Sequence, residues 1–241
     1  MSRLVLVTLL LAGCVDGGDE GMTVISNSAS DTCSFTGEKS QPFRAHGTIW
    51  TGSPSGYVFT PLIESRITPI EGGDDAQRSI AITGANVGLE VKAATIESNG
   101  TFTSTTVSLT TEQSQFSQLF SAPLPPSGTV NVLFELSPRQ TLVAIANAAG
   151  TNNLEAEVLA TVRVIGRFNG NDIQSAPFQF PVTVCTDCVV NNLGSCVDLT
   201  VTPRATGNAC NPFQDGVIDC CESETRGLVC PAVAEEPPQV P

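Results

Sequence analysis

Residues 157–168 read EVLATVRVIGRF, residues 169–172 read NGND, and residues 173–184 read IQSAPFQFPVTV. Apolar and polar side chains alternate on both sides of the tetrapeptide, which is the pattern of strands with one buried face. Asn169-Gly170 favours a tight turn between paired strands, because both residues readily adopt a positive φ. The stretch therefore predicts a β-hairpin. Pro181 donates no backbone hydrogen bond, so the second strand should be an edge strand or carry a bulge.

Shorter strand patterns recur upstream of the hairpin and are separated by turn residues. Only 15% of the residues are charged, and Thr, Val, Ser and Ala are abundant, which is typical of exported β-proteins. We therefore expect an all-β fold over residues 33–184, namely an antiparallel immunoglobulin-like β-sandwich. The Cys–Trp–Cys spacing of antibody domains is absent, so this expectation concerns the architecture alone. Further strands are expected at residues 43–51, 57–67, 79–83, 87–97, 102–109 and 130–136, and residues 112–120 fit a short helix or an irregular crossover.

One clearer helix is expected at about residues 138–149. Ser137, Pro138 and Gln140 suit the N-cap, N1 and N3 positions of a capping box. The apolar residues that follow share one helical face, which predicts packing across one end of the β-domain. Gly150 can end the helix, since glycine accepts the backbone conformation that a helix terminus often requires.

The chain contains nine cysteines, and Cys14 stands apart from the other eight. Eight is an even number and an exported protein meets an oxidising environment, so four disulfides are expected. Seven of the eight follow residue 184. This predicts a disulfide-rich segment at residues 185–230 that packs on the β-domain, followed by a disordered tail at residues 231–241. The eight residues are Cys33, Cys185, Cys188, Cys196, Cys210, Cys220, Cys221 and Cys230.

The order of the cysteines narrows their pairing without fixing it. Cys33 precedes the first strands and is expected to pair with Cys185 or Cys188, which follow the last one. Cys220 and Cys221 are adjacent and should have different partners. Cys185 and Cys188 form a CxxC motif, which also occurs in redox and zinc sites. It follows a strand instead of opening a helix and has no second CxxC, so neither alternative is favoured.

The N-terminal residues have the pattern of an export signal. Arg3 precedes a run of nine mostly apolar residues from Leu4 to Ala12. This length suits the apolar region of a signal peptide for the general secretory pathway, and it is far below the ~20 residues that span a bilayer. After Cys14 the sequence turns abruptly polar and acidic, which marks the edge of a targeting segment.

The motif Leu11-Ala12-Gly13-Cys14 resembles the lipobox of bacterial lipoproteins. The resemblance implies that cleavage removes residues 1–13 and that lipid on Cys14 anchors the protein in a membrane. In that class an Asp directly after the cysteine retains the protein in the inner membrane. Val15 occupies this position, which favours the outer membrane, facing the periplasm or the cell surface. An ordinary secretory signal cleaved nearby is the alternative. Residues 14–32 should then form a flexible acidic tether.

The chain is strongly acidic, with a formal net charge of −13. Such a protein repels nucleic-acid phosphates and gains nothing from an anionic lipid surface, so no nucleic-acid partner is expected. No P-loop, GxGxxG, G-x-S-x-G or HExxH motif occurs, and no cofactor is expected. These features favour a non-enzymatic binding, adhesive or structural role in the cell envelope, with an envelope protein or a glycan as the possible partner.

One stretch raises the question of calcium. Residues 211–222, NPFQDGVIDCCE, align loosely with the EF-hand loop, and Asp215, Asp219 and Glu222 would then be the metal ligands. Phe213 occupies a ligand position and no helices flank the loop, which weakens the match. A turn between disulfides is therefore expected, and a calcium-stabilised surface module is kept as an alternative.

Catalytic candidates are few. His46 is the single histidine and is expected to be an ordinary strand residue. Asp74 and Asp75 should lie on a solvated loop. Trp50 and Tyr57 are the only residues of their types and are expected to pack in the core or sheet, although either could line a binding surface. A hydrolase that uses clustered carboxylates is the remaining alternative, and a deep pocket of grouped acids would favour it.

Overall fold

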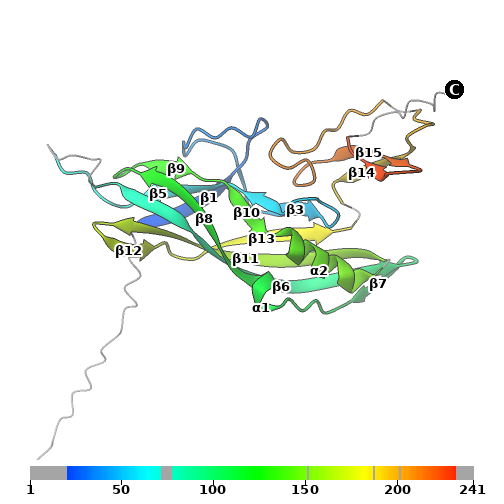
Figure 1. Ribbon diagram of the computed structural model, residues 1–241, viewed down its shortest axis with the longest axis horizontal. Helices are drawn as coiled ribbons and strands as arrows, with labels where there is room; N and C mark the ends of the chain where they lie inside the picture. The colour runs from blue at the N-terminus through cyan, green and yellow to red at the C-terminus, as the bar shows by residue number, and fades with distance from the viewer. Residues whose placement is uncertain (1–20, 72–77, 151, 187, 201, 232–241) are drawn as a thin grey trace, which may run out of the picture.

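The computed structural model describes residues 21–71, 78–150, 152–186, 188–200 and 202–231. Within these ranges the chain is mostly β-sheet with two short helices (Figure 1), so the all-β prediction is confirmed. Most neighbouring strands are antiparallel, but β3 (Gly47–Trp50) and β13 (Phe178–Cys185) pair in parallel, as do β14 (Val190–Ser195) and β15 (Ile218–Ser223). The expectation of a wholly antiparallel fold is therefore wrong.

The largest sheet contains the two longest strands and has the order β3-β13-β11-β6-β7. Strand β12 also pairs with β11, and β8 also pairs with β6. Its strands are β3 (Gly47–Trp50), β6 (Ile80–Ser98), β7 (Thr101–Ser104), β8 (Gln115–Leu124), β11 (Asn153–Phe168), β12 (Asn171–Gln174) and β13 (Phe178–Cys185).

The predicted hairpin lies in this sheet. Strand β11 turns at Asn169 and Gly170, whose φ values are 50° and 80°, and Phe168 faces Asn171 across the turn. Positive φ at both positions is what an Asn-Gly turn provides. The returning chain pairs with β11 first as β12 and then as β13. Strand β13 lies between β11 and β3 and neither pairing has a bulge, so the expected edge strand or bulge is wrong. Pro181 is tolerated because it lies one residue before β13 meets β3 at Val182, where its missing N–H interrupts no bond to β3.

Strand β6 is continuous where the sequence predicted two strands, at residues 79–83 and 87–97. It runs for 19 residues, and its pairing with β8 shifts register between Ile82 and Gly84. A Cβ atom at Gly84 would lie 2.2 Å from the backbone oxygen of Gln118 in β8. This glycine therefore permits the close approach of two strands at a bulge and does not form a turn.

A second sheet has the order β2-β1-β5-β9, and β10 and β4 form a separate pair. The expected strand at residues 57–67 is divided at Thr60, and the one at residues 130–136 is divided in the same way, because each half joins a different sheet. The strands are β1 (Met22–Ser28), β2 (Phe43–Arg44), β4 (Tyr57–Phe59), β5 (Pro61–Ser65), β9 (Thr129–Asn131) and β10 (Phe134–Ser137).

Strand β1 corrects the predicted tether. A flexible segment was expected at residues 14–32, but Met22–Ser28 pairs with β5 along its length. Met22 and Val24 are buried in the main core, at 1% and 7% exposure. Burial of these two side chains offsets the ordering of a stretch whose composition alone suggested a linker. The part of the expected tether at residues 14–20 lies outside the described residues.

The sheets curl around one apolar core, and α2 packs against it beside β11 and β13. Phe59 from β4 contacts Phe134 and Phe180 with ring centroids 5.6 Å and 5.2 Å apart. Leu142 and Ile145 of α2 are fully buried in the same cluster. Alternation along β11 places every second side chain in this core from Leu154 to Val164. The period-two pattern thus reports the buried face correctly.

The helices differ from the expectation in their caps. Helix α2 (Arg139–Ala149) confirms the predicted helix, but its N-cap is Pro138, with no side-chain capping bond. Ser137 ends β10, so the expected capping box is wrong. Helix α1 (Thr111–Ser114) has a complete capping box between Thr110 and Gln113, and β8 follows it directly.

All eight cysteines form disulfides, in the expected number of four bridges. Cys33 pairs with Cys210, Cys185 with Cys188, Cys196 with Cys221, and Cys220 with Cys230. The expected partners of Cys33 are therefore wrong, since the loop that carries Cys33 meets the loop that carries Cys210. The adjacent Cys220 and Cys221 do have different partners, as expected.

The disulfide-rich segment forms a small sheet of its own. Its strands are β14 (Val190–Ser195), β15 (Ile218–Ser223) and β16 (Gly227–Val229), in the order β14-β15-β16. Figure 1 shows this sheet at one end of the molecule, while β12 and the beginning of β1 lie at the other. Gly21 lies beside Ile173 of β12, which places the first described residue at that opposite end.

Candidate functional site

The disulfide-rich segment is attached to the β-domain through the loop at residues 211–215. The backbone N–H of Trp50 donates to the carbonyl of Phe213 at 3.1 Å, and that of Asp215 donates to Thr48 at 2.9 Å. The Gln214 side chain bonds to both backbone groups of Val58, at 2.7 Å and 2.9 Å. The loop thus continues the hydrogen bonding of two strands, which fixes its position on the domain.

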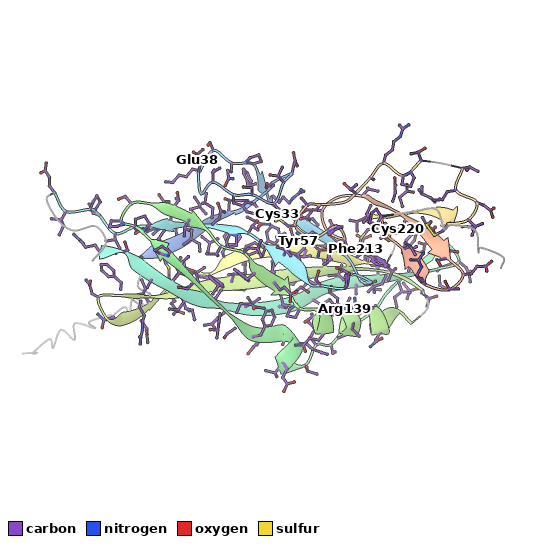
Figure 2. All side chains as sticks on the ribbon, turned by 45° about the horizontal axis from the view of Figure 1, so that its top comes forward. Cys33, Glu38, Tyr57, Arg139, Phe213 and Cys220 are labelled. Carbon is purple, nitrogen blue, oxygen red and sulfur yellow. A yellow bond between two sulfur atoms is a disulfide. The ribbon has the colours of Figure 1, made fainter. Side chains whose placement is uncertain are left out.

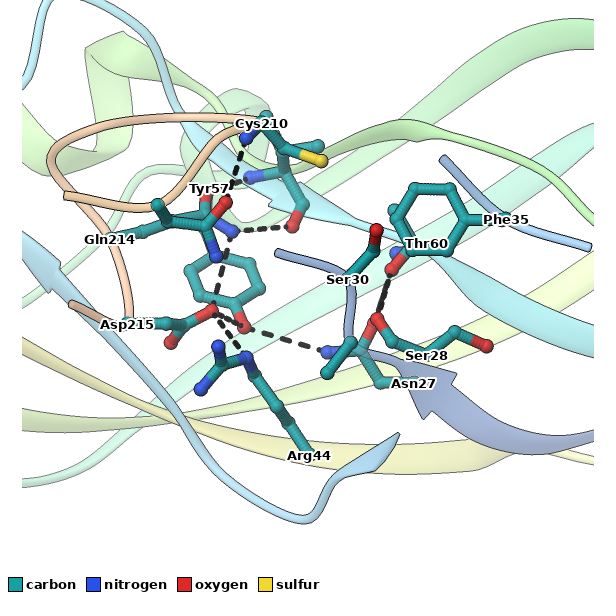
Figure 3. Close-up of a pocket in the computed structure, with 13 residues that line it drawn as sticks. Asn27, Ser28, Ser30, Phe35, Arg44, Tyr57, Thr60, Cys210, Gln214 and Asp215 are labelled. Carbon is teal, nitrogen blue, oxygen red and sulfur yellow. Dashed lines mark hydrogen bonds and ion pairs between the residues drawn. The ribbon is translucent and has the colours of Figure 1, made fainter. Parts of the chain in front are cut away.

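A buried carboxylate lies at the centre of this attachment (Figure 3). The Tyr57 hydroxyl donates to Asp215 Oδ2 at 2.8 Å, and the Thr48 N–H donates to Oδ1 at 2.8 Å. Gln214 Nε2 donates to Oδ2 at 3.3 Å, and Arg44 Nε lies 3.5 Å from the same oxygen. The Asp215 side chain is 3% exposed. A buried charge needs such partners, so the network specifies one arrangement of loop and domain.

Burial dominates the electrostatics of this network. Desolvation raises the pKa of Asp215 above its ordinary value, although the bonds from Thr48 and Tyr57 and the charge of Arg44 act in the opposite direction. Burial, together with the Asp215 carboxylate, also raises the pKa of Tyr57. The phenol therefore keeps its proton and remains a donor. Gly47 makes room for the ring, because a Cβ there would lie 2.6 Å from Tyr57.

The network is a structural joint and not a ligand pocket. The cavity among Asn27, Arg44, Tyr57 and Asp215 has a volume of about 10 Å³, which is the space of a single water molecule. Figure 2 shows Tyr57 in the β-domain and Phe213 on its side toward Cys220 of β15. Tyr57 thus packs in the core, as expected for it.

A larger hollow, the junction cleft, opens where the two parts of the chain meet. It has a volume of about 450 Å³, which is within the range of small-ligand sites. One wall comes from the end of β3 and the residue after β13, and the other comes from all three strands of the disulfide-rich sheet. The lining residues are Trp50, Thr186, Val190, Asn192, Glu222, Ser223, Gly227 and Leu228.

The aromatic side chain of the cleft is held from several sides. Trp50 Nε1 donates to the carbonyl of Thr186 at 3.1 Å. The indole also packs against Phe213, with ring centroids 5.4 Å apart. Gly52 leaves room for the indole, since a Cβ there would lie 2.3 Å from the ring. Trp50 is therefore fixed before any ligand arrives, which lowers the entropic cost of binding.

The polar side of the cleft is an amide–carboxylate pair. Asn192 Nδ2 donates to Glu222 Oε1 at 2.8 Å, and Asn192 Oδ1 accepts from the N–H of Gly194 at 2.9 Å. Parallel pairing of β14 with β15 brings the two side chains within reach of each other on neighbouring strands. The Thr186 hydroxyl oxygen accepts from the N–H of Leu154 at 2.7 Å, which leaves its hydrogen available for donation.

Two further hollows occur on the large sheet. One, of about 460 Å³, lies over Gly88 between Gln115 and Arg163. The other, of about 270 Å³, lies beside the Cys185–Cys188 bridge and is lined by Glu97, Glu155 and Phe102. The first hollow has no acid in its lining. The two acids of the second do not form the deep, grouped set that a carboxylate hydrolase would need, because Glu155 is exposed on the outer sheet face.

The three calcium candidates are not brought together. Asp215 belongs to the buried network, whereas Asp219 and Glu222 lie on β15. The Asp219 carboxylate accepts from the N–H groups of Ala205 and Arg204 at 2.9 Å and 2.6 Å, which lowers its pKa. Within the described ranges, no group of three or more His, Cys, Asp or Glu residues could hold a metal ion. The EF-hand alignment is therefore wrong, because its second half is a strand.

The remaining candidate residues also lie apart from one another and form no common site among the described residues. His46 lies in the bend before β3 and not in a strand, where its ring contacts the Thr183 hydroxyl at 3.0 Å and Glu157 at 3.5 Å. Cys185 and Cys188 bond to each other at the end of β13, and no helix follows them among the residues that the structure describes. Cys14, Asp74 and Asp75 lie outside the described residues.

Sequence reasoning did not identify the junction cleft. Trp50 stands out as the single tryptophan, but no sequence motif includes Asn192, and Glu222 was a candidate only as a calcium ligand. Trp50 lies more than 130 positions before the other residues of the cleft, which fall within residues 186–228, so no local motif joins them. The one usable signal was the single tryptophan close before a predicted loop.

Comparison with known proteins does not assign the chain to a family. No protein-family model and no curated protein matches the chain. Among solved structures, the crystal structure of a protein from Archaeoglobus fulgidus has a TM-score of 0.31 and 12% identity, and the match covers 54% of this chain and 86% of that chain. This likeness is too slight to identify a fold or a function. In the described part of the chain, no helix has the length and apolar character needed to cross a membrane.

Proposed function

We propose that this protein is a lipid-anchored binding module of the bacterial cell envelope, that it is not an enzyme, and that its ligand site is the junction cleft. The observation that carries the proposal is the position of this cleft. The cleft is lined by β14, β15 and β16, and this small sheet lies at the end of the fold opposite to the beginning of β1 (Figure 1). A buried network and a disulfide hold the two parts of the chain on either side of the cleft together.

The anchor is supported by the lipobox and by the disulfides. The Leu11-Ala12-Gly13-Cys14 motif directly follows an apolar run, and the eight other cysteines are all paired. Four bridges agree with an oxidising compartment outside the cytoplasm. Two or three acyl chains on one residue give a firm anchor, since each buried CH₂ contributes about 0.8 kcal/mol. Val15 favours the outer membrane.

Strand β1 shortens the connection between lipid and domain. It begins at Met22, so only residues 15–21 separate it from Cys14. Seven residues reach at most about 25 Å when fully extended. The β12 end of the domain would then face the membrane, and the junction cleft would point away from it. A ligand outside the membrane surface therefore has free access to the cleft.

We also propose that the β-domain is an immunoglobulin-like sandwich. Curled sheets on either side of one core support it, while the parallel β3–β13 pair departs from the antiparallel pattern. A binding role is supported over hydrolysis by the content of the cleft. Glu222 is its only carboxylate, whereas glycoside hydrolysis and similar chemistry use two carboxyl groups in different environments.

Lipid labelling tests the anchor. The full-length gene is expressed in a bacterial host fed with an alkyne-tagged palmitate, and the membranes are separated by density. We expect label on the wild-type protein in the outer-membrane fraction and none on Cys14→Ser. Val15→Ala serves as the matched control and should keep the label. Label that persists on Cys14→Ser, or wild-type protein without label, would overturn the anchor.

A further inference from the structure

We propose that the junction cleft binds a neutral oligosaccharide, with the ring faces of the sugar on Trp50 and its hydroxyl groups on Asn192 and Glu222. The inference rests on the binding role proposed above and names the chemical class of the ligand. It depends on the composition of the cleft walls, on the bonds that its polar groups already make, and on the rigidity of the joint behind it.

The charge of the cleft excludes most other ligand classes. Among its lining residues there is no Lys, Arg or His, and Glu222 is the single ionisable side chain. Phosphates, nucleotides and acidic peptides need positive partners, which the cleft lacks, and the net charge of −13 repels them further. A neutral ligand rich in hydroxyl groups meets no such repulsion.

The hydrogen bonds left open in the cleft match a pair of neighbouring hydroxyl groups. Glu222 uses Oε1 for Asn192, and a carboxylate has about four acceptor positions, so most of its capacity remains. The Asn192 amide donates one of its two hydrogens to Glu222, and the other is available. The Thr186 hydroxyl can also donate. A sugar hydroxyl both donates and accepts, and it can therefore bond to the carboxylate and the amide at once.

The apolar part of the cleft matches the other property of a sugar ring. Trp50 has a large apolar surface with its N–H already bonded to Thr186, and Val190 and Leu228 line the same space. The C–H faces of a pyranose pack on such surfaces, while its hydroxyl edge is directed toward polar groups. Apolar and polar walls thus occur together, as an amphipathic ring requires.

Intrinsic fluorescence provides a direct test, because Trp50 is the only tryptophan of the chain. Full-length protein in detergent is titrated with triacetylchitotriose, cellotriose and maltotriose, each to about 10 mM, a range that reports weak affinities. We expect a saturable change in emission with at least one of them. An N-acetylated ligand would respond to the first probe and a plain hexose polymer to the others. No change with any of the three would overturn the proposal.

Variants assign the binding to the cleft. Asn192→Ala and Glu222→Gln should each weaken binding about tenfold or more, as expected for the loss of a bond to a charged group or its partner. Gln115→Ala, in the hollow over Gly88, is the matched control and should change the affinity by less than about twofold. Unchanged affinity in both cleft variants would refute the assignment. Lipid labelling of Cys14 is read separately, so a failed ligand class and a failed anchor remain distinguishable.

Discussion

Replacing Tyr57 by Phe isolates one bond of the buried network and keeps the aromatic ring. The substitution removes the hydroxyl that donates to Asp215 at 2.8 Å and accepts weakly from Asn27 at 3.5 Å. Asp215 keeps its bonds from Thr48 and Gln214. A hydrogen bond to a buried charged group contributes about 1.5–3 kcal/mol. We therefore expect the free energy of unfolding to fall by about 2 kcal/mol.

Urea denaturation of the oxidised protein, followed by the fluorescence of Trp50, measures this loss. With a slope of about 2 kcal/mol per molar urea, the midpoint should fall by about 1 M. Thr183→Val is the matched control, because it removes a hydroxyl that donates to Glu157 at 2.5 Å on a half-exposed surface. Exposed pairs contribute little, so this variant should lose less than about 0.5 kcal/mol.

A double variant separates the bond from the packing. In an Asp215→Asn background the phenol bonds to a neutral oxygen, so Tyr57→Phe should cost only about 1 kcal/mol there. The difference between the two backgrounds measures the part that depends on the carboxylate. If Tyr57→Phe costs no more than Thr183→Val, or costs the same in both backgrounds, the reasoning about the buried charge is wrong.

Three other predictions concern the same joint and the large sheet. Burial raises the pKa of Asp215 above its ordinary 3.8, so between these two pH values the folded state binds a proton that the unfolded state has lost. The stability of wild type relative to Asp215→Asn should therefore fall as the pH rises from 3.8 through the raised pKa of Asp215. Urea titrations at several pH values measure this difference, and a difference that stays constant with pH would contradict the prediction. Gly84→Ala should destabilise by about 2–3 kcal/mol, because its Cβ would lie 2.2 Å from the Gln118 oxygen, while Gly88→Ala, with its nearest atom at 4.0 Å, should be nearly neutral in the same assay. The double variant Cys33→Ser/Cys210→Ser removes a disulfide between residues 177 positions apart, and the free energy of unfolding should fall by about 4–5 kcal/mol. Peptide mapping of the wild-type protein without reduction should recover Cys33 linked to Cys210. A peptide that links Cys33 to Cys185 would refute the assigned pairing.

The local parts of the fold were predictable because each depends on neighbouring residues. The period-two alternation of residues 157–168 identified both the strand and its buried face, and Asn169-Gly170 identified its turn. Asn99-Gly100 carries the same turn signal between β6 and β7, with φ values of 50° and 75°. Gly150 ended the predicted helix with φ 62°.

Predictions failed where the same local sequence pattern is compatible with two different structures. Gly84 lies in the gap between the strands expected at residues 79–83 and 87–97, but glycine also permits the close approach of a neighbouring strand, which is its role beside Gln118. Residues 22–28 had the composition of a linker, yet pairing with β5 and burial of Met22 order them as β1. In both cases a distant strand supplies the interactions that decide the outcome.

By itself, the sequence determined the β-sheet class, the hairpin, the helix and an even set of eight cysteines. These follow from turn chemistry, side-chain periodicity and composition, which act over a few residues. Only the tertiary structure decided the partner of Cys33, the burial of Asp215 beside Tyr57, and the union of Trp50 with Glu222 in one cleft. Tyr57 and Asp215 are 158 positions apart. Bonds over such distances form only when the whole core brings the segments together, and no short stretch of residues records them.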